Sequence, residues 1–273
     1  MTVDDSYVLG RSSAEYQRLR AQAKLWEGAA RQLLQRADLR PGMSCLDIGC
    51  GPGEVMRLMG EMVGPTGHVL GIDIDGTIGR IAVGELSQTS ASNFAFLECD
   101  VAASPALPGA PFDLSYARFV LTHLTDPLAL VRKMAAATKP GGVIAVQDYN
   151  MGGFDIQPRP ATWPILERVV LGVFELSGKD PRIGNKLPLV FVDADLGAPD
   201  GTDVVGITGL LRDHGPRVVA GFRSLLPAAL KLGLTTKTEG QACLEELGRL
   251  IAEGPDRTYS SFLLVSAWKR KPA

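Results

Sequence analysis

Residues 44–53 read Ser-Cys-Leu-Asp-Ile-Gly-Cys-Gly-Pro-Gly and say more about the architecture than any other stretch. A short apolar run ends in three glycines at alternate positions, Gly49, Gly51 and Gly53. Glycine permits a positive φ and lets a ligand approach the backbone closely. The apolar residues over 54–63 follow at helical spacing, so the loop connects a strand to a helix. Open α/β sheets bind ligands at such junctions.

The composition is ordinary for a globular protein and argues against several functional classes. Of 273 residues, 45% are hydrophobic and 21% charged, with a formal net charge of −2. Nucleic-acid binding needs a basic face, so nucleic acid is not an expected partner. No apolar run reaches the ~18 residues that span a bilayer and no secretory pattern opens the chain, so no membrane partner is expected. The four cysteines lack CxxC spacing, which predicts reduced thiols, a cytoplasmic location and no metal site.

Strand and helix patterns alternate from residue 13 to about 150, which predicts an α/β fold with a doubly wound, mostly parallel sheet of seven strands. Helices are expected over 13–37, 54–63, 76–90, 126–138, 162–177, 216–232 and 236–253. Strands are expected over 43–48, 68–73, 94–98, 112–117, 143–148, 202–208 and 259–268. The last helix opens with a capping box, Thr236-x-x-Glu239.

The regular alternation ends after Asn150, and this break defines the expected domain organisation. Residues 1–40 form an N-terminal helical cover and residues 41–150 the ligand-binding core. Residues 151–257 form helical lid insertions with one core strand near 202–208, and residues 258–273 supply the last core strand and a tail.

Three carboxylates narrow the ligand of the glycine loop. Asp47 precedes the glycines, where it would repel a phosphate but suit an ammonium or sulfonium group. Asp73 lies 20 residues after Gly53, a spacing that places an acid on ribose hydroxyls in nucleotide-binding sheets. Asp100 ends the third strand, where it can accept from the amine of an adenine. Together these acids fit an adenosine with a cationic amino-acid tail.

The ordered motifs of residues 40–150 closely resemble those of class I S-adenosylmethionine-dependent methyltransferases. They are Leu46-Asp47-Ile48-Gly49-Cys50-Gly51-Pro52-Gly53, Gly71-Ile72-Asp73-Ile74-Asp75, Glu98-Cys99-Asp100-Val101, Phe112-Asp113-Leu114-Ser115-Tyr116-Ala117-Arg118, Leu121-Thr122-His123-Leu124 and Lys139-Pro140-Gly141-Gly142. The opening Tyr7-Val8-Leu9-Gly10 and Glu15-x-x-Arg18-Leu19-x-x-Gln22 resemble a bacterial small-molecule branch. The resemblance fades over 150–258.

The resemblance implies S-adenosylmethionine as cofactor, S-adenosylhomocysteine as product and a set of cofactor-binding residues. Asp73 would hold the ribose, Asp100 and Val101 the adenine, and Arg18, Gln22 and Arg118 the methionine end. The complete expected set is Arg18, Gln22, Asp47, Gly49, Gly51, Gly53, Asp73, Ile74, Asp100, Val101, Arg118 and Phe119.

Residues for the acceptor side are fewer. His123 is either a general base for the proton lost on methylation or a histidine that orders its loop. Tyr149 and His214 are candidate substrate-binding residues, and Asp148, beside Tyr149 at the end of the fifth strand, is an alternative to it. Aromatic lid residues are expected to form an apolar pocket: Phe154, Trp163, Phe174, Phe191 and Phe222.

The expected function is methyl transfer to a small organic acceptor in specialised metabolism, with O- or N-methylation as the default and C-methylation open. The alternative is a protein that binds S-adenosylmethionine without methylating, as a cyclase-type catalyst or a non-catalytic subunit. A nicotinamide oxidoreductase is disfavoured, because glycines at 49, 51 and 53 do not give GxGxxG. Whether the chain forms a homodimer is left open.

Overall fold

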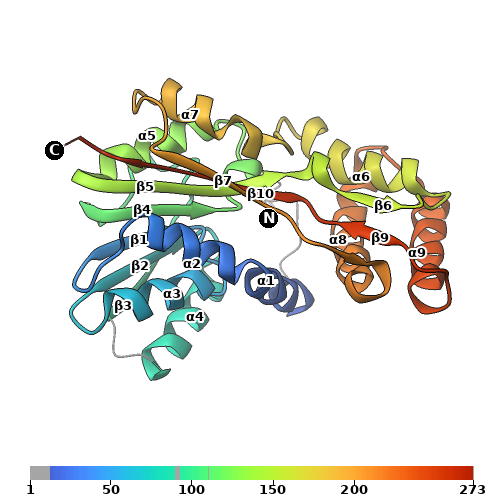
Figure 1. Ribbon diagram of the computed structural model, residues 1–273, viewed down its shortest axis with the longest axis horizontal. Helices are drawn as coiled ribbons and strands as arrows, with labels where there is room; N and C mark the ends of the chain where they lie inside the picture. The colour runs from blue at the N-terminus through green and yellow to red at the C-terminus, as the bar shows by residue number, and fades with distance from the viewer. Residues whose placement is uncertain (1–12, 90–92, 110, 273) are drawn as a thin grey trace.

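A seven-stranded sheet dominates the computed structural model, which describes residues 13–89, 93–109 and 111–272 (Figure 1). The strand order is β3-β2-β1-β4-β5-β10-β7. The first five strands run parallel, whereas β10 is antiparallel to both of its neighbours. The strands are β1 (Ser44–Ile48), β2 (His68–Asp73), β3 (Asn93–Glu98), β4 (Phe112–Arg118), β5 (Thr138–Asn150), β7 (Gly201–Val205) and β10 (Leu263–Arg270). The expected fold class is confirmed.

Helices cover both faces of this sheet because side chains of successive strand residues alternate between the faces. Cys45 and Tyr116 pack under one layer of helices, and Leu46 and Ala117 under the other. The first layer holds α2 (Glu27–Arg36), α3 (Glu54–Val63) and α4 (Gly76–Thr89). The second holds α5 (Pro127–Ala137) and α7 (Leu187–Asp193).

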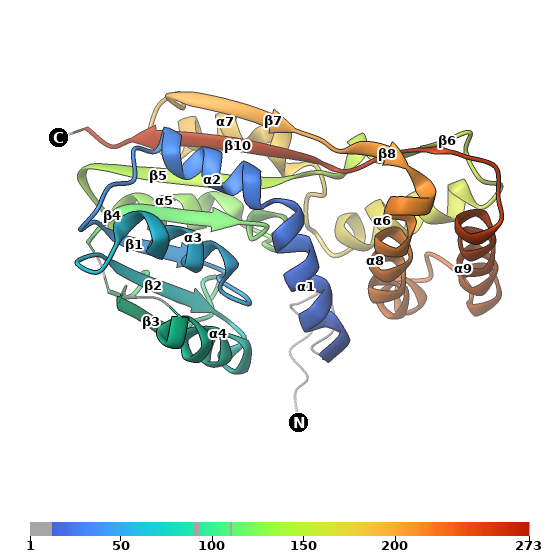
Figure 2. The same ribbon diagram turned by 60° about the horizontal axis from the view of Figure 1, so that its bottom comes forward.

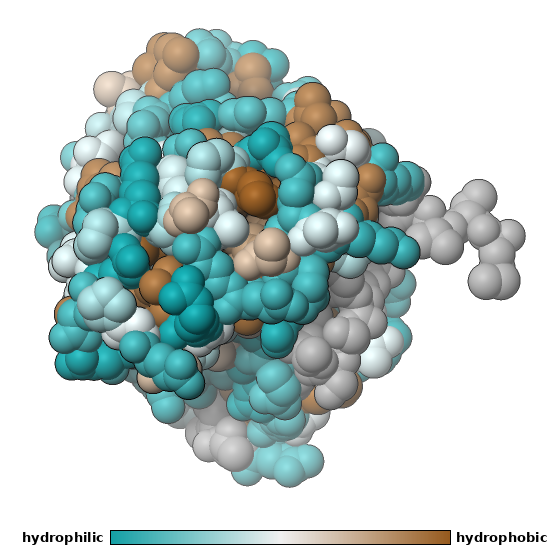
Figure 3. Space-filling model, turned by 90° about the vertical axis from the view of Figure 1, so that its right-hand side faces the viewer, coloured by the Kyte–Doolittle hydropathy of each residue, from teal (hydrophilic) through white to brown (hydrophobic). Residues whose placement is uncertain are grey.

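A smaller unit adjoins the carboxyl ends of the parallel strands and has its own apolar core (Figures 1 and 2). Its outer end, which faces the viewer in Figure 3, is mostly hydrophilic. Its helices are α6 (Trp163–Leu176), α8 (Leu211–Lys231) and α9 (Lys237–Ala252). Its antiparallel sheet has the order β6-β9-β8, with β6 (Asp155–Gln157), β8 (Thr208–Leu210) and β9 (Thr258–Ser260).

The single helix expected over 13–37 is wrong, because the chain kinks at Trp26. The kink divides it into α1 (Ser13–Leu25) and α2. Trp26 has φ −102° and ψ 12°, and its indole is buried. Residues 1–12, which include Tyr7–Gly10, lie outside the described residues. Figure 2 shows α1 between the large sheet and the smaller unit, and α1 contacts α8.

Three further expectations in the second half need correction. The strand expected over 259–268 is two strands, β9 and β10, in different sheets, and the strand over 202–208 divides likewise into β7 and β8. Helix α8 begins at Leu211, five residues before the expected 216, and keeps Pro216 inside. Proline is typical of a first helical turn, but burial of Leu211 at 1% exposure extends the helix beyond it. Helix α7 was not predicted from the sequence.

Strand β5 begins at Thr138, five residues before the expected 143, and strand β6 was not expected. The other elements agree with the sequence to within two residues. Helix α3 and strand β2 have the expected bounds. The capping box of α9 is present, with Thr236 and Glu239 bonding each other's backbone. Three short 3-10 helices, η1 (Leu121–His123), η2 (Met151–Gly153) and η3 (Ile183–Lys186), join the larger elements. No helix among the described residues has the length and apolar character needed to cross a bilayer.

Candidate active site

The glycine loop between β1 and α3 has a positive φ at each of its three glycines, 66° at Gly49, 48° at Gly51 and 78° at Gly53. A Cβ on Gly49 would meet Val120 Cγ2 at 2.5 Å, and one on Gly53 would meet Ala82 Cβ at 2.9 Å. A Cβ on Gly51 would meet nothing within 4 Å. Gly51 alone of the three therefore borders open space, and Gly53 serves the packing of α3 on α4.

A cavity of about 1360 Å³ lies beyond this loop, at the carboxyl ends of β1–β5. Helices α1, α6 and α8 and strand β9 complete its walls. Thirteen of the residues expected to bind cofactor or acceptor line it: Arg18, Gln22, Asp47, Gly49, Gly51, Asp73, Ile74, Asp100, Val101, Arg118, Phe119, His123 and Tyr149. Gly53 and His214 are not among the lining residues.

The three expected carboxylates enter the cavity from adjacent strands with different surroundings. Asp47 is 2% exposed, and its Oδ2 has no hydrogen-bond partner among the described residues. Asp73 accepts hydrogen bonds from the N–H groups of Gly51 and Asp75, both at 2.9 Å. Asp100 is exposed and accepts from Ala102 N at 2.8 Å. The acids therefore converge on one side of the cavity.

Burial gives Asp47 an unusual titration. It raises the pKa of this carboxyl from 3.8 to about 7, and the nearby charge of Asp73 acts in the same direction. The positive charge of Arg118 and a backbone hydrogen bond from Met56 oppose the rise in pKa. Arg118 is itself only 9% exposed. Asp47 is thus a carboxylate that a bound cation would stabilise.

An aromatic cluster joins the end of β4 to the end of β5. Phe119, at φ 59°, stacks on Tyr149 with ring centroids 4.2 Å apart, and the Arg118 guanidinium carbon lies 5.3 Å from the Phe119 centroid. The Tyr149 oxygen accepts hydrogen bonds from Gln22 Nε2 and Trp26 Nε1, each at 2.8 Å. Trp26 belongs to no motif recognised in the sequence, so its contact with Tyr149 was not expected.

His123 ends η1 in the same cavity, with its ring centroid 5.7 Å from that of Phe174. Burial, together with the positive charges of Lys179 and Arg18, lowers the pKa of the imidazole from 6.5 to about 3. Its side chain is therefore neutral near pH 7. Asp148 instead lies behind the site, fully buried, and accepts from Thr122 N at 3.2 Å and Tyr149 N at 2.8 Å.

The aromatic residues expected in the lid divide into two groups. Phe154, Phe174 and Phe222 line the cavity, whereas Trp163 and Phe191 do not. Trp163 stacks on Phe154 at 5.3 Å, and Phe191 belongs to the core beneath the sheet. His214 does not line the cavity, but its ring stacks on that of the lining residue Tyr259, with the ring centroids 5.0 Å apart. The sequence did not single out Lys179, Arg217 or Phe262 as lining residues, because all three lie in segments where no motif was recognised.

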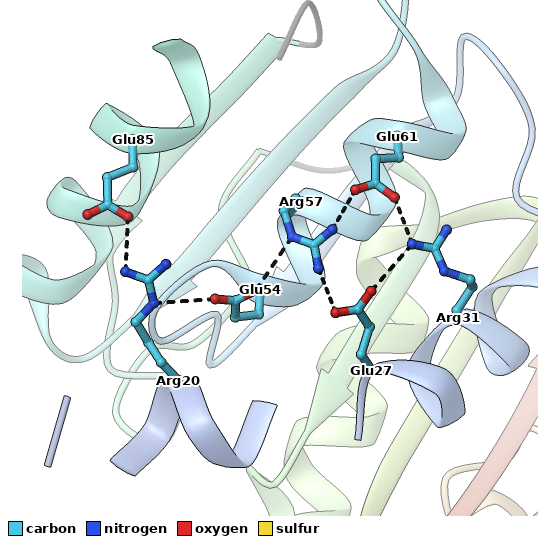
Figure 4. Close-up of polar contacts among 7 residues, drawn as sticks. All are labelled: Arg20, Glu27, Arg31, Glu54, Arg57, Glu61 and Glu85. Atoms are coloured by element: carbon cyan, nitrogen blue, oxygen red, sulfur yellow. Dashed lines mark hydrogen bonds and ion pairs between the residues drawn. The ribbon is translucent and has the colours of Figure 1, made fainter. Parts of the chain in front are cut away.

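Ion pairs hold α1 and α2 against α3 and α4 beside the glycine loop (Figure 4). Arg20 of α1 lies 3.4 Å from both Glu54 and Glu85. Arg57 of α3 contacts Glu27 of α2 at 2.9 Å. The full network contains Arg20, Glu27, Arg31, Glu54, Arg57, Glu61 and Glu85. It fixes the helices that wall one side of the cavity.

A comparison with known families shows the family of this chain. The family model described as methyltransferase domain matches residues 16–167, more than half of the chain. The chain belongs to this family. The match begins within α1 and ends within α6, so it covers the glycine loop, the three carboxylates and the aromatic cluster. The family expected from the sequence is confirmed.

Two curated relatives are similar in sequence to parts of this chain, and a solved structure shares its fold. Nocamycin O-methyltransferase of Saccharothrix syringae is 35% identical over 117 residues, 43% of this chain and 41% of the relative. An uncharacterized 37.1 kDa protein in a transposon of Streptomyces fradiae is 28% identical over 82% of this chain and 61% of its own length. The chain thus spans about half the length of the curated relatives it matches. A putative methyltransferase structure from Bacillus halodurans has the same fold, with TM-score 0.60, 16% identity and coverage of 89% of this chain and 99% of the other.

Proposed function

We propose that this protein is an enzyme that transfers a methyl group from S-adenosylmethionine to a small organic acceptor. The observation that carries the proposal is the convergence of Asp47, Asp73 and Asp100 on one cavity beside the open backbone of Gly51. An adenosine with a cationic tail has three groups that these acids can bind: the ribose hydroxyls, the adenine amine and the positive charge.

The residues present fit that cofactor on two structural grounds. The Asp47 Oδ2 atom is buried without a hydrogen-bond partner among the described residues, which is expected of an atom that interacts with a bound cation. The open space at Gly51 leaves the backbone accessible to a ligand. S-adenosylmethionine would supply a methyl group that its sulfonium charge makes electrophilic.

We assign binding roles to the lining residues accordingly. Asp73 holds the ribose hydroxyls, because its carboxylate ends β2 beside Gly51, from whose N–H it accepts a hydrogen bond, and lines the cavity. Asp100 and Val101 bind the adenine. Arg18, Gln22 and Arg118 surround the methionine end, with Asp47 opposite its positive charge.

The acceptor end of the cavity works mainly by positioning and by excluding water. Phe154, Phe174 and Phe222 provide an apolar wall against which an organic acceptor is desolvated. His123 is neutral, so its imidazole can take a proton from an acceptor hydroxyl or amine. Its low pKa makes it a weak base. We therefore attribute most of the rate enhancement to the positioning of the acceptor against the methyl group.

The relatives' names do not fix the acceptor atom. They include an O-methyltransferase, a trans-aconitate 2-methyltransferase of an Azoarcus species and a ubiquinone/menaquinone C-methyltransferase of Ectopseudomonas mendocina. We propose a small molecule as the acceptor, not a nucleic acid, because the net charge is −2. The four free thiols support a cytoplasmic location.

Calorimetric titration with S-adenosylmethionine and with NAD tests the cofactor. We expect binding of the first only, and binding of NAD alone would end the proposal. Incubation with methyl-labelled cofactor and fractionated extracts of the source organism then tests transfer. Tight cofactor binding without any labelled product would favour the alternative, a binding protein that does not methylate.

A variant pair sharpens the assignment of the ribose site. Asp73→Ala should weaken cofactor binding by about 1.5–3 kcal/mol, the cost of a lost charged hydrogen bond. Asp113→Ala is the matched control, because this carboxylate lies near the start of β4, pairs with Lys139 at 2.9 Å and is not a lining residue. Equal affinities for Asp73→Ala and the unmodified protein would make the ribose assignment wrong.

A further inference from the structure

Five aromatic rings follow one another along the wall of the cavity. This ring row begins where Phe119, directly after β4, stacks on Tyr149, near the end of β5, with ring centroids 4.2 Å apart. Phe262, between β9 and β10, meets Tyr149 edge-to-face at 5.2 Å and Phe154 edge-to-face at 5.6 Å. Phe154 in turn meets Tyr259 of β9 edge-to-face at 6.1 Å. All five residues line the cavity, so the row is continuous.

The ring row starts at the cofactor end of the cavity and leads away from it. The guanidinium carbon of Arg118 lies 5.3 Å from the centroid of Phe119, and its positive charge acts on the Asp47 carboxyl. Strand β9, at the far end of the row, belongs to the smaller unit (Figure 1). The cavity volume of about 1360 Å³ exceeds the roughly 300–1,000 Å³ of most ligand pockets. The cavity therefore has room for a second molecule along the row, beside the cofactor.

Several rings of the row keep part of their surface open. Phe119, Phe154 and Phe262 are only partly buried, although each contacts other aromatic rings. Trp163, which does not line the cavity, stacks on Phe154 with ring centroids 5.3 Å apart and supports it from outside the cavity. Apolar surface in contact with water favours a ligand that covers it. The row therefore presents ring surface to which an apolar acceptor can bind.

The geometry of the row favours an aromatic ligand over an aliphatic one. At its three edge-to-face junctions the interplanar angles run from 64° to 75°, so neighbouring rings present faces and edges in turn. An aromatic ligand can stack on a face and meet an edge, and both contacts stabilise a pair of rings beyond the area that they bury. A ligand of two or more fused rings can contact neighbouring rings of the wall at the same time. An aliphatic ligand lacks these interactions and gains from buried area alone.

We propose that the acceptor is an aromatic molecule of at least two fused rings, which binds along the ring row with the group to be methylated at the Phe119–Tyr149 end. This inference rests on the proposed function, because it takes the end of the cavity that holds Asp47 as the cofactor end. Phe174 of α6 and Phe222 of α8 also line the cavity and extend its aromatic surface beyond the row.

A pair of uncharged alcohols tests the proposal without knowledge of the natural acceptor. The protein saturated with S-adenosylhomocysteine is titrated with 2-naphthalenemethanol and with its saturated analogue, decahydro-2-naphthalenemethanol. The two alcohols share a carbon skeleton and an aliphatic hydroxyl group, and neither carries a charge that would respond to the lining residues Lys179 and Arg217. Burial of apolar area alone would favour the saturated alcohol, which is the more apolar of the two. Tighter binding of the aromatic alcohol therefore reports on contacts between rings.

We expect the aromatic alcohol to bind about tenfold more tightly than its saturated analogue, the effect of two aromatic contacts. Benzyl alcohol and cyclohexylmethanol form the matching one-ring pair, and their difference in affinity should be smaller. Equal binding of the two-ring alcohols, tighter binding of the saturated one, or no binding of either would overturn the proposal. A preference in the one-ring pair as large as that in the two-ring pair would overturn the requirement for fused rings.

The variants Phe154→Leu and Phe262→Leu assign the preference to the ring row. Each replaces a ring by an aliphatic side chain, so the preference for the aromatic alcohol should fall to about threefold or less. The affinity of the saturated alcohol should stay nearly the same. Phe94→Leu is the matched control, because Phe94 is also partly buried but lies in β3 and is not a lining residue. A preference that keeps its full size in both variants of the row would overturn the assignment to this wall.

The two proposals fail in different ways. S-adenosylmethionine affinity, measured by calorimetry, reports on Asp47, Asp73 and Asp100 and should be the same in Phe154→Leu and the unmodified protein. Absence of cofactor binding in the unmodified protein would refute the proposed cofactor. The comparison of the alcohols can then be made on ligand-free protein, where its outcome decides the role of the ring row alone.

Discussion

The phenol oxygen of Tyr149 accepts a hydrogen bond of 2.8 Å from the indole Nε1 of Trp26. This contact links the kink between α1 and α2 to the end of β5, 123 residues along the chain. Gln22 Nε2 donates to the same oxygen at 2.8 Å. The helical wall and the aromatic cluster of the site are therefore held by one hydroxyl group.

Replacement of that hydroxyl should loosen the wall. Tyr149→Phe leaves the buried Trp26 N–H without its acceptor, so the free energy of unfolding should fall by about 1–3 kcal/mol. Urea denaturation measures the change. Trp26→Phe removes the same hydrogen bond, so the double variant should cost clearly less than the sum of the two single variants. Full additivity would show that the two residues act independently.

The sequence predicted the core of this protein well because its signals there are local. The glycine loop, the strand-end acids and the apolar periodicity of α3 each arise within a few neighbouring residues. Eleven of the thirteen expected site residues that line the cavity follow parallel strands, whose carboxyl ends meet at one edge of the sheet; Arg18 and Gln22 come from α1.

Tertiary contacts explain what the sequence could not give. The kink at Trp26 accompanies a hydrogen bond to a residue of distant β5. Helix α8 extends to Leu211 because that residue is buried and its N–H donates to Arg257 O at 2.9 Å. Lys179 follows an apolar helix without any motif, so its place in the cavity depends on how α6 packs. None of these contacts has a signature in neighbouring residues.

The glycine loop offers a contrast between a ligand-facing and a packing glycine. Both Gly51 and Gly53 have positive φ, so alanine strains the backbone similarly, by about 1 kcal/mol, at each. Gly51→Ala projects a methyl group into open space, whereas Gly53→Ala forces one against Ala82 at 2.9 Å. We expect Gly51→Ala to reduce cofactor affinity more than stability, and Gly53→Ala to do the reverse. Calorimetry and urea denaturation of both variants decide, and the opposite ranking would contradict the packing analysis.

The ion-pair network of Figure 4 should make a small, salt-sensitive contribution to stability. Arg57 contacts Glu27 at 2.9 Å and Glu54 at 3.5 Å, but all three side chains are partly exposed. Arg57→Gln should therefore cost about 1 kcal/mol or less in low salt, and less again in 1 M NaCl. Arg80→Gln, in an exposed pair with Glu98, is the control and should cost almost nothing. A cost that does not change with salt would mean that Arg57 acts through packing.

His123 should make the protein less stable as the pH falls. Its pKa in the folded state, about 3, is below the ordinary value of 6.5, so the unfolded chain takes up a proton that the native imidazole refuses. The contribution of neutral His123 to the free energy of unfolding is fully present above pH 6.5 and is lost as the pH falls towards 3. Compared with His123→Gln, the unmodified protein should lose on the order of 2 kcal/mol more between pH 7 and 5. Parallel stability curves would mean that the native imidazole titrates normally.

Asp47 should show the opposite pH dependence. Its pKa in the folded state is about 7, above the usual 3.8, so the contribution is fully present below pH 3.8 and is lost as the pH rises through 7. Asp47→Asn removes the ionisation, and its stability relative to the unmodified protein should rise by on the order of 2 kcal/mol from pH 5 to pH 8. Urea denaturation of ligand-free protein at both pH values measures this.

The same substitution should weaken S-adenosylmethionine binding at pH 8, because the carboxylate opposite the cation is gone. Asp148→Asn is the control, since that buried carboxyl also has a raised pKa but accepts two backbone N–H groups and is not a lining residue. It should lower stability and leave cofactor affinity nearly unchanged. If the Asp47→Asn protein were destabilised but kept its full cofactor affinity at pH 8, Asp47 would stabilise the fold and would not bind the positive charge of the cofactor.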